Sequence, residues 1–185
     1  HSSRASPSIL LEVAQKLYHK YRHTRSDLPG FGQSTRLPHK NYGIEAQSKR
    51  VIELTKTLNL KPGFIVGSSM GGALALWLAR EHPKQWKKIV VIGPATDPTL
   101  PKFDFYKFPY VAFVAYPFIN RISVWLSLRR VLANHEQITV ERISVSLRNQ
   151  EEGWHSLFTL FKATELLAEQ RMPHAFHLVQ QPILI

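Results

Sequence analysis

The chain has 185 residues, of which 44% are hydrophobic and 20% are charged. This composition predicts a globular domain with a buried core and excludes a disordered chain, which has too few apolar residues to fold. The net charge is +11, but the basic residues are scattered and no nucleic-acid-binding motif occurs, so we expect no nucleic-acid partner. The absence of cysteine excludes disulfides, thiolate metal sites and cysteine nucleophiles.

The first part of the chain contains two predicted helices separated by a strand and a turn. Apolar residues at helical spacing predict a helix over 9–21, and a polar strand is expected at 23–26. Proline and glycine predict a turn at 28–32. An amphipathic helix is expected over 42–58, because its apolar residues again share one face.

Two apolar strands then surround a third helix. The strands are expected at 64–66 and 88–92, and the helix, rich in alanine and leucine, at 73–82. Parallel strands need crossover connections, and helices then cover the sheet. The pattern therefore predicts an α/β fold with a mostly parallel sheet flanked by helices.

Beyond the strand at 88–92 the pattern becomes helical and shows no strand for a long stretch. We expect helices at 122–132, 139–149 and 156–170. The predicted organisation is a partial α/β core at 1–93, an inserted helical cap at 94–173, and a return to the core at 174–185.

The two ends of the chain suggest a fragment of a longer protein. It begins at His1 without an initiator methionine and ends within Pro182–Ile185, which resembles the beginning of a buried strand. The sequence contains neither a signal peptide nor an apolar stretch long enough to span a bilayer. The sequence does not determine the compartment, and it favours a cytoplasmic or membrane-peripheral location.

The sequence Gly67-Ser68-Ser69-Met70-Gly71 lies between a predicted strand and a predicted helix. A serine in such a tight turn is presented to a substrate, and glycines let the backbone fold closely around it. The N–H of the next residue, Met70, can then stabilise an oxyanion together with the N-terminus of the helix. The motif predicts Ser69 as a nucleophile.

With this motif, the chain resembles the α/β-hydrolase superfamily, specifically its capped serine hydrolases. The segment Asp27–Ser34 is similar to the family's turn after its fourth strand, where the matching aspartate helps hold the turn. His1–Arg4 resembles the loop after the third strand, so the resemblance implies Ser3 as the second oxyanion donor. It implies a core that is incomplete here, and no metal or organic cofactor.

The resemblance also implies a catalytic acid and a histidine. In the family both follow the strand that resembles Gln181–Ile185, so we expect them beyond Ile185. Asp97 matches an alternative acid position of some members, and it could instead cap a helix or hinge the cap. His174 and His177 have a spacing that a metal could use, but no carboxylate or thiolate accompanies them, so we expect no metal site.

The stretch from Phe103 to Trp125 is rich in aromatic and basic residues. Such a stretch could cover an apolar substrate, rest on a membrane, or pack the cap against the core. The candidate substrate contacts are Phe105, Phe108, Phe113 and Trp125.

These features predict a serine hydrolase that cleaves an ester or related acyl bond, with a small apolar ester or acyl compound as its substrate. A carbon–carbon bond hydrolase and a non-catalytic binding or interaction protein on the same scaffold remain open as alternatives. A peripheral membrane contact through the basic, aromatic cap is the second partner to consider.

Overall fold

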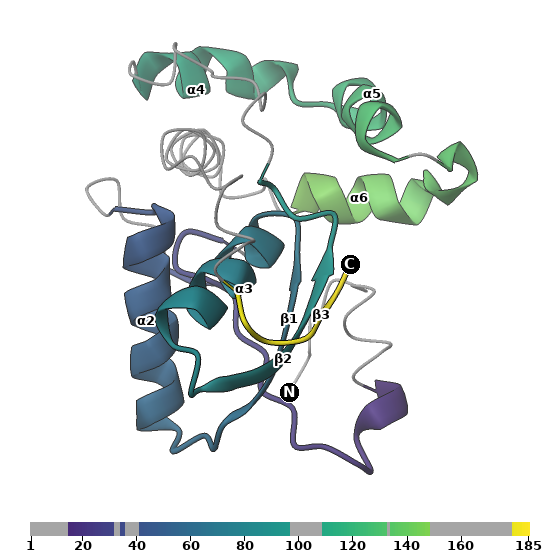
Figure 1. The fold of residues 1–185 in the computed structure, drawn as a ribbon. Coiled ribbons are helices and arrows are strands. Elements are labelled where there is room, and N and C mark those ends of the chain that lie inside the picture. Colours follow the sequence, from purple (N-terminus) through teal and green to yellow (C-terminus); the bar gives the residue numbers. More distant parts are fainter. Residues whose placement is uncertain (1–14, 32–33, 36–40, 97–108, 133, 149–178) are drawn as a thin grey trace.

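The computed structural model describes residues 15–31, 34–35, 41–96, 109–132, 134–148 and 179–185 (Figure 1). Of the sequence predictions, the cap helix at 156–170 and residues 9–14 of the helix at 9–21 lie outside these residues.

Three parallel strands form the sheet, in the order β1-β2-β3. They are β1 (Gly63–Ser68), β2 (Trp86–Ile92) and β3 (Ile183–Leu184). Ser68 lies opposite Ile92, so β1 and β2 end level with each other. The predicted parallel sheet is therefore confirmed, including the strand at the end of the chain.

Two helices cover one face of this sheet. They are α2 (Ile44–Thr57) and α3 (Met70–Glu81); α3 packs directly on β1 and β2, and α2 packs against α3. Small side chains bring α3 close to the strands, since Ala75 and Ala79 are buried against Ile89. The first helix was predicted from its apolar spacing and the second from its alanine and leucine content, and both position the turn that joins β1 to α3.

The other face of the sheet carries apolar side chains that are exposed in the described part of the chain. Phe64 and Val66 of β1, Ile92 of β2 and Leu184 of β3 belong to this group. Tyr21 covers part of it, because its ring meets that of Phe64 edge-on at 5.6 Å. Residues along β1 thus alternate in exposure, because one face of the sheet is covered by helices and the other is exposed in the described part of the chain.

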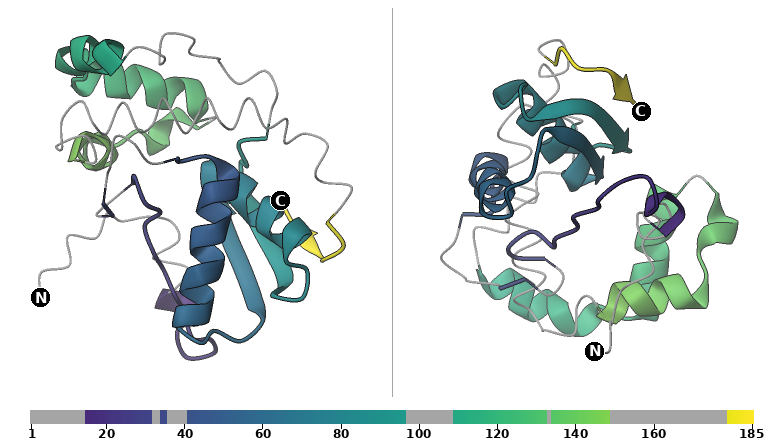
Figure 2. Two further views of the ribbon diagram at one scale, coloured as in Figure 1. Left: turned by 90° about the vertical axis from the view of Figure 1, so that its left-hand side faces the viewer. Right: turned by 90° about the horizontal axis from the view of Figure 1, so that it is seen from below.

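Between β2 and β3 in the sequence, residues 109–148 are mostly helical. The elements are α4 (Pro109–Ala115), the 3₁₀ helix η2 (Tyr116–Phe118), α5 (Arg121–Val131), the 3₁₀ helix η3 (His135–Gln137) and α6 (Val140–Arg148). They lie on the side of the molecule toward which the strands point (Figures 1 and 2). Within the described ranges, no helix combines the length and apolar character needed to cross a membrane.

The start of α5 is fixed by a reciprocal cap. The Asn120 side chain accepts hydrogen bonds from the N–H groups of Ile122 and Ser123, at 2.9 and 3.0 Å. The Ser123 side chain in turn accepts from the Asn120 N–H at 2.9 Å. This arrangement satisfies N–H groups that have no partner inside the helix, so α5 begins at a defined residue.

Two sequence predictions near the N-terminus are wrong. Residues 23–26 do not form a strand; their side chains are all exposed, and this polar segment has no apolar face to bury against a sheet. The helix predicted to reach Tyr21 ends earlier, because residues 15–17 are helical and 18–20 form a turn. There the N–H groups of Lys20 and Tyr21 both bond to the carbonyl of Leu17.

The fold predicts different costs for two leucine truncations. Leu78 is fully buried in the cluster that joins α2, α3 and β2, whereas Leu58 at the end of α2 is 39% exposed. Leu78→Ala should lower the free energy of unfolding by about 2–5 kcal/mol, because it removes buried methyl groups and leaves a cavity. Leu58→Ala should lower it by no more than about 1 kcal/mol. Urea denaturation of both variants measures the difference, and equal losses would contradict this packing.

Candidate functional site

A one-residue turn joins β1 to α3. β1 ends at Ser68, α3 begins at Met70, and Ser69 between them has φ 53° and ψ −120°. L-residues rarely adopt this backbone conformation, which costs on the order of 1–3 kcal/mol and persists only where surrounding interactions impose it. The tight turn predicted at Ser69 is therefore present, and Ser69 itself adopts a strained backbone conformation.

Hydrogen bonds to the end of β2 and to the segment after it hold Ser69 in this conformation. Its N–H donates to the carbonyl of Ile92 at 2.9 Å. Its carbonyl accepts from the N–H of Gly72 at 2.9 Å, at the start of α3, and from the N–H of Ala95 at 3.0 Å. Ser69 is thus bonded on one side of its α-carbon to the last residue of β2 and on the other to a residue that follows β2, and these bonds offset the strain.

The glycines around Ser69 have different steric roles. A Cβ on Gly67 would lie 2.1 Å from the carbonyl oxygen of Gly71, so only glycine fits at the end of β1. A Cβ on Gly72 would lie 3.0 Å from the Cβ of Pro94, a close approach of α3 to the turn after β2. A Cβ on Gly71 would meet no atom within 4 Å. Close packing thus requires glycine at 67, favours it at 72, and does not require it at 71.

The two groups that chemistry would need are free at this turn. The Ser69 side chain is exposed, and its hydroxyl has no hydrogen-bond partner among the described residues. Met70 is the first residue of α3, and no described group accepts a hydrogen bond from its N–H. N–H groups in the first turn of a helix favour negative charge. A hydroxyl next to a free, positively polarised N–H can attack a carbonyl and stabilise the resulting oxyanion.

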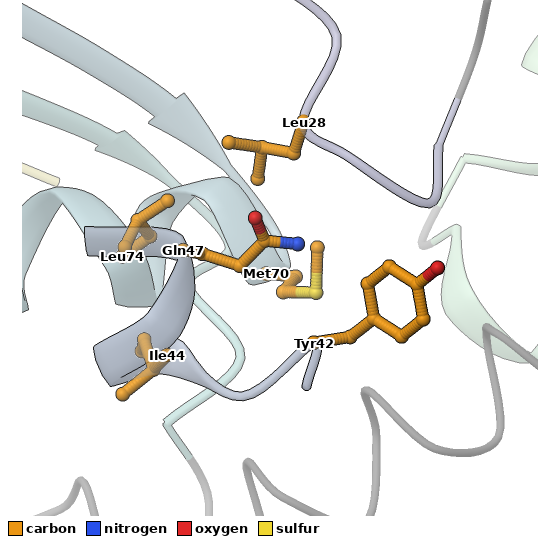
Figure 3. A pocket seen from close by; sticks show the side chains of 6 residues that line it. All are labelled: Leu28, Tyr42, Ile44, Gln47, Met70 and Leu74. Atoms are coloured by element: carbon orange, nitrogen blue, oxygen red, sulfur yellow. The ribbon is translucent and has the colours of Figure 1, made fainter. Parts of the chain in front are cut away.

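A small cavity lies beside the turn (Figure 3). Its lining residues come from the 28–31 turn, from α2 with the residues before it, and from α3: Leu28, Tyr42, Ile44, Gln47, Met70 and Leu74. About 10 Å³ of it is open to the centre of a water molecule, roughly the space that one water needs. In this conformation the cavity has no room for a substrate. The side chains that line it pack the 28–31 turn, α2 and α3 against one another.

Gln47 connects this cavity to the turn at residues 28–31. Its side chain is 2% exposed, and its amide N–H donates to the carbonyl of Pro29 at 2.8 Å, while its amide oxygen accepts from Arg50 at 3.2 Å. The turn is closed further by a 2.7 Å bond from the Ser34 hydroxyl to the backbone carbonyl of Asp27. Gln47 thereby fixes the turn against α2, next to Met70.

These features coincide with the result of comparing the sequence with protein families. The model of the alpha/beta hydrolase fold family matches residues 3–121. The chain belongs to the α/β-hydrolase family. In this family the strand–serine–helix turn described above is the nucleophile elbow, and we use that name for residues 67–72 from here on.

Relatives and solved structures agree with this assignment. The chain is 31% identical over 121 residues to the magnesium-chelatase 30 kDa subunit of Rhodobacter capsulatus, covering 65% of this chain and 39% of that protein. It is 37% identical over 67 residues to 2-hydroxymuconate semialdehyde hydrolase of Pseudomonas putida, covering 36% and 24%. The fold is similar to that of Cfl2 from Burkholderia cenocepacia, with a TM-score of 0.69, 19% identity and coverage of 94% and 73%. The chain therefore spans well under half the length of these two relatives.

Several predicted site residues lie outside the described residues, namely Ser3, Asp97, Phe105 and Phe108. Phe113 lies on α4 and Trp125 on α5, and both are exposed. Neither lines the cavity beside Met70. Their role as substrate contacts stays a prediction, whereas Ser69 and Met70 lie together at the elbow as the sequence predicted.

Sequence reasoning missed the buried polar contact that supports the elbow. Gln47 falls on the apolar stripe of α2, three residues after Ile44 and four before Val51. A polar residue on such a stripe indicates a buried side chain that needs hydrogen-bond partners. Its partner, the Pro29 carbonyl, belongs to a distant turn and carries no mark in the sequence.

No metal-binding group is found in the part of the chain that the structure describes. Three or more histidine, aspartate or glutamate side chains never gather there in a way that could hold an ion. His174 and His177, whose spacing suggested the question, lie outside that part, so the expected absence of a metal site stays a prediction.

The unequal glycines of the elbow predict unequal effects of alanine. Gly67→Ala should lower the free energy of unfolding by about 3 kcal/mol or more, because its methyl group overlaps the Gly71 carbonyl. Gly71→Ala should leave stability unchanged or raise it by up to about 1 kcal/mol, since alanine favours the helix. Thermal unfolding of the two variants is the measurement. A larger loss at Gly71 than at Gly67 would refute the described geometry.

Gln47 provides a second stability test. Gln47→Ala should lower the free energy of unfolding by about 1–3 kcal/mol, because it removes the donor from the partly buried Pro29 carbonyl and leaves a space where the buried glutamine side chain packs. The control is Gln137→Ala, at an exposed glutamine of η3, which should change stability by less than about 0.5 kcal/mol. Chemical denaturation compares the two, and equal effects would mean that the Gln47 contact does not fix the turn.

Proposed function

We propose that the protein is a serine hydrolase that cleaves an ester or related acyl bond through an acyl-enzyme on Ser69. The observation that carries this proposal is the strained, exposed Ser69 between β1 and α3, next to the N–H of Met70, which donates to no acceptor among the described residues. Strained backbone conformations cluster at functional sites, where they aim a reactive group. Membership in the α/β-hydrolase family supports the same assignment.

The reaction follows from these two groups. The Ser69 hydroxyl oxygen attacks the substrate carbonyl carbon, its proton passes to a general base, and the carbonyl oxygen becomes an oxyanion held by the Met70 N–H. The tetrahedral intermediate collapses, the leaving alcohol takes the proton from the base, and the acyl group stays on Ser69. Water, deprotonated by the same base, then attacks the acyl carbon and releases the acid.

The base is assigned to a residue outside the described part of the chain. A serine hydroxyl is a weak nucleophile until a base accepts its proton, and no described side chain hydrogen-bonds to that of Ser69. We propose a histidine oriented by a carboxylate, as the family resemblance implies, with Asp97 as an alternative acid. Ser3 is proposed as the second oxyanion donor, and neither metal nor organic cofactor takes part.

A carbon–carbon bond hydrolase is the second candidate. It is favoured by the 37% identity to 2-hydroxymuconate semialdehyde hydrolase, which extends over 67 residues. The same nucleophile elbow serves both reactions, so the elbow alone does not choose between them. Loss of the absorbance of a conjugated ring-cleavage product, compared with hydrolysis of a simple ester, separates the two candidates. A binding protein on the same scaffold would catalyse neither reaction.

A fluorophosphonate probe tests the nucleophile in the full-length protein. We expect labelling at Ser69, because the oxygen of an activated serine attacks the phosphorus of the probe, displaces fluoride and becomes phosphonylated. Ser69→Ala should abolish labelling and lower kcat by roughly 10⁴- to 10⁶-fold, as removal of the nucleophile does in serine hydrolases. Ser68→Ala is the control: Ser68 is also exposed and adjacent in sequence, and its loss should leave labelling in place.

The labelled peptide identifies the modified residue by mass spectrometry. Labelling of Ser69→Ala at the wild-type rate would show that another residue is the nucleophile. No labelling of the wild-type full-length protein would favour the non-catalytic binding protein.

A further inference from the structure

Helix α5 has an apolar stripe on its exposed side. Ile122 is 69% exposed, Leu126 is 48% exposed, and Trp125 beside them is also exposed. Their spacing of three and four residues places them on one face of the helix. A helix on the surface of a globular protein usually turns its polar face to water and its apolar stripe to the core. Because the stripe of α5 is exposed, its apolar partner must be something other than the core of this domain.

The preceding helix has the same character. On α4 and η2 the exposed apolar residues are Tyr110, Phe113, Val114 and Phe118, with Tyr110 and Phe118 each more than 70% exposed. Three of these residues, Tyr110, Val114 and Phe118, line an open hollow together with Ala115. We call the exposed residues of α4, η2 and α5 the α4–α5 surface; it lies at the end of the molecule away from the sheet (Figures 1 and 2).

The charge of the α4–α5 surface has a single sign. Residues 109–131 include no aspartate or glutamate, and their three arginines, Arg121, Arg129 and Arg130, are all exposed. The guanidinium of Arg129 lies 5.1 Å from the centre of the Trp125 ring, a cation–π arrangement that places a charge directly against an aromatic side chain. This surface thus combines apolar rings with positive charge, and no acidic residue lies in the same segment, 109–131.

We propose that the α4–α5 surface docks on an anionic lipid bilayer. Amphipathic helices at membrane interfaces bury aromatic and aliphatic residues at the boundary of headgroups and acyl chains, and their basic residues meet anionic headgroups. Phe118, Ile122 and Leu126 supply the apolar contact, and Arg121 and Arg130 supply the charge. The net charge of +11 adds long-range attraction to the same surface.

A second copy of the chain fits this surface less well than a bilayer does. In a symmetric dimer the same patch faces itself, which would bring the arginines of both copies to one interface without an acidic partner in residues 109–131. An anionic bilayer supplies both an apolar layer and negative charge. The docking proposal does not depend on the chemistry of Ser69, so the two can fail separately.

Vesicle flotation of the full-length protein tests the proposal. Vesicles of phosphatidylcholine with phosphatidylserine should carry the protein upward, vesicles of phosphatidylcholine alone should carry much less, and added salt should release part of it. The double variant Phe118→Ser/Ile122→Ser should lower binding at least about tenfold, because it removes two apolar contacts. Arg121→Gln/Arg130→Gln should lower binding roughly fivefold per arginine.

Matched variants separate docking from general effects. Val140→Ser removes an exposed apolar side chain from α6 and should bind vesicles like the wild type. Lys56→Gln/Lys61→Gln removes two positive charges near the end of α2 and should lower binding much less than Arg121→Gln/Arg130→Gln, because only the long-range attraction changes. Circular dichroism verifies that each variant is folded, and fluorophosphonate labelling reports separately on Ser69. Absence of wild-type flotation with anionic vesicles would overturn the proposal. Equal loss in the control variants, or a concentration-dependent dimer in sedimentation that Phe118→Ser/Ile122→Ser dissolves, would do so too.

Discussion

The geometry of the nucleophile elbow depends on hydrogen bonds that the backbone of Ser69 makes with the last residue of β2 and with the chain just after it. The N–H bonds to Ile92 and the carbonyl to Ala95, so Ser69 keeps a conformation that its own helix does not impose. These bonds require that Ser68 lie opposite Ile92, the last pair of the β1–β2 register. A slip of one residue would separate Ser69 from both partners. The pairing of the two strands therefore determines where the hydroxyl lies.

The core is built to keep α3 close enough for those bonds. Alanines on the buried side of α3 let the helix approach β2, and Gly72 lets it pass the turn at Pro94. Gln47 then links α2 to the turn at Pro29 through its hydrogen bond to the Pro29 carbonyl, and Gln47 lines the same small cavity as Met70. The N–H of Met70 is left without an acceptor in the described part of the chain, although its side chain packs in the core. Packing and a free polar group at the same residue are what an oxyanion donor requires.

The sequence allowed the sheet and the elbow to be predicted, because both depend on local patterns. Apolar spacing located α2, a segment rich in alanine and leucine located α3, and short apolar runs located the strands. A serine between two glycines located the turn. The start of α3 was placed three residues late, at Ala73, since the sequence does not show that the turn is one residue long. Contacts between distant segments, such as Gln47 with Pro29, carry no local pattern. The strand predicted at 23–26 did not form, because this polar segment has no apolar face to bury against the sheet.

Helical periodicity reveals that a stripe exists but not what it faces. The apolar spacing of α5 is compatible with a core, a substrate or a bilayer, and only its exposure distinguishes these environments. The strands point toward the helical segment that contains α5 (Figure 1), so a substrate that reaches Ser69 from that side passes those helices. If the α4–α5 surface rests on a bilayer, apolar esters dissolved in the membrane would be concentrated close to the elbow. If Ser69 also hydrolyses esters, docking would favour the same class of substrate. A more apolar ester partitions more strongly into the bilayer, and the protein would bind its substrate from that bilayer.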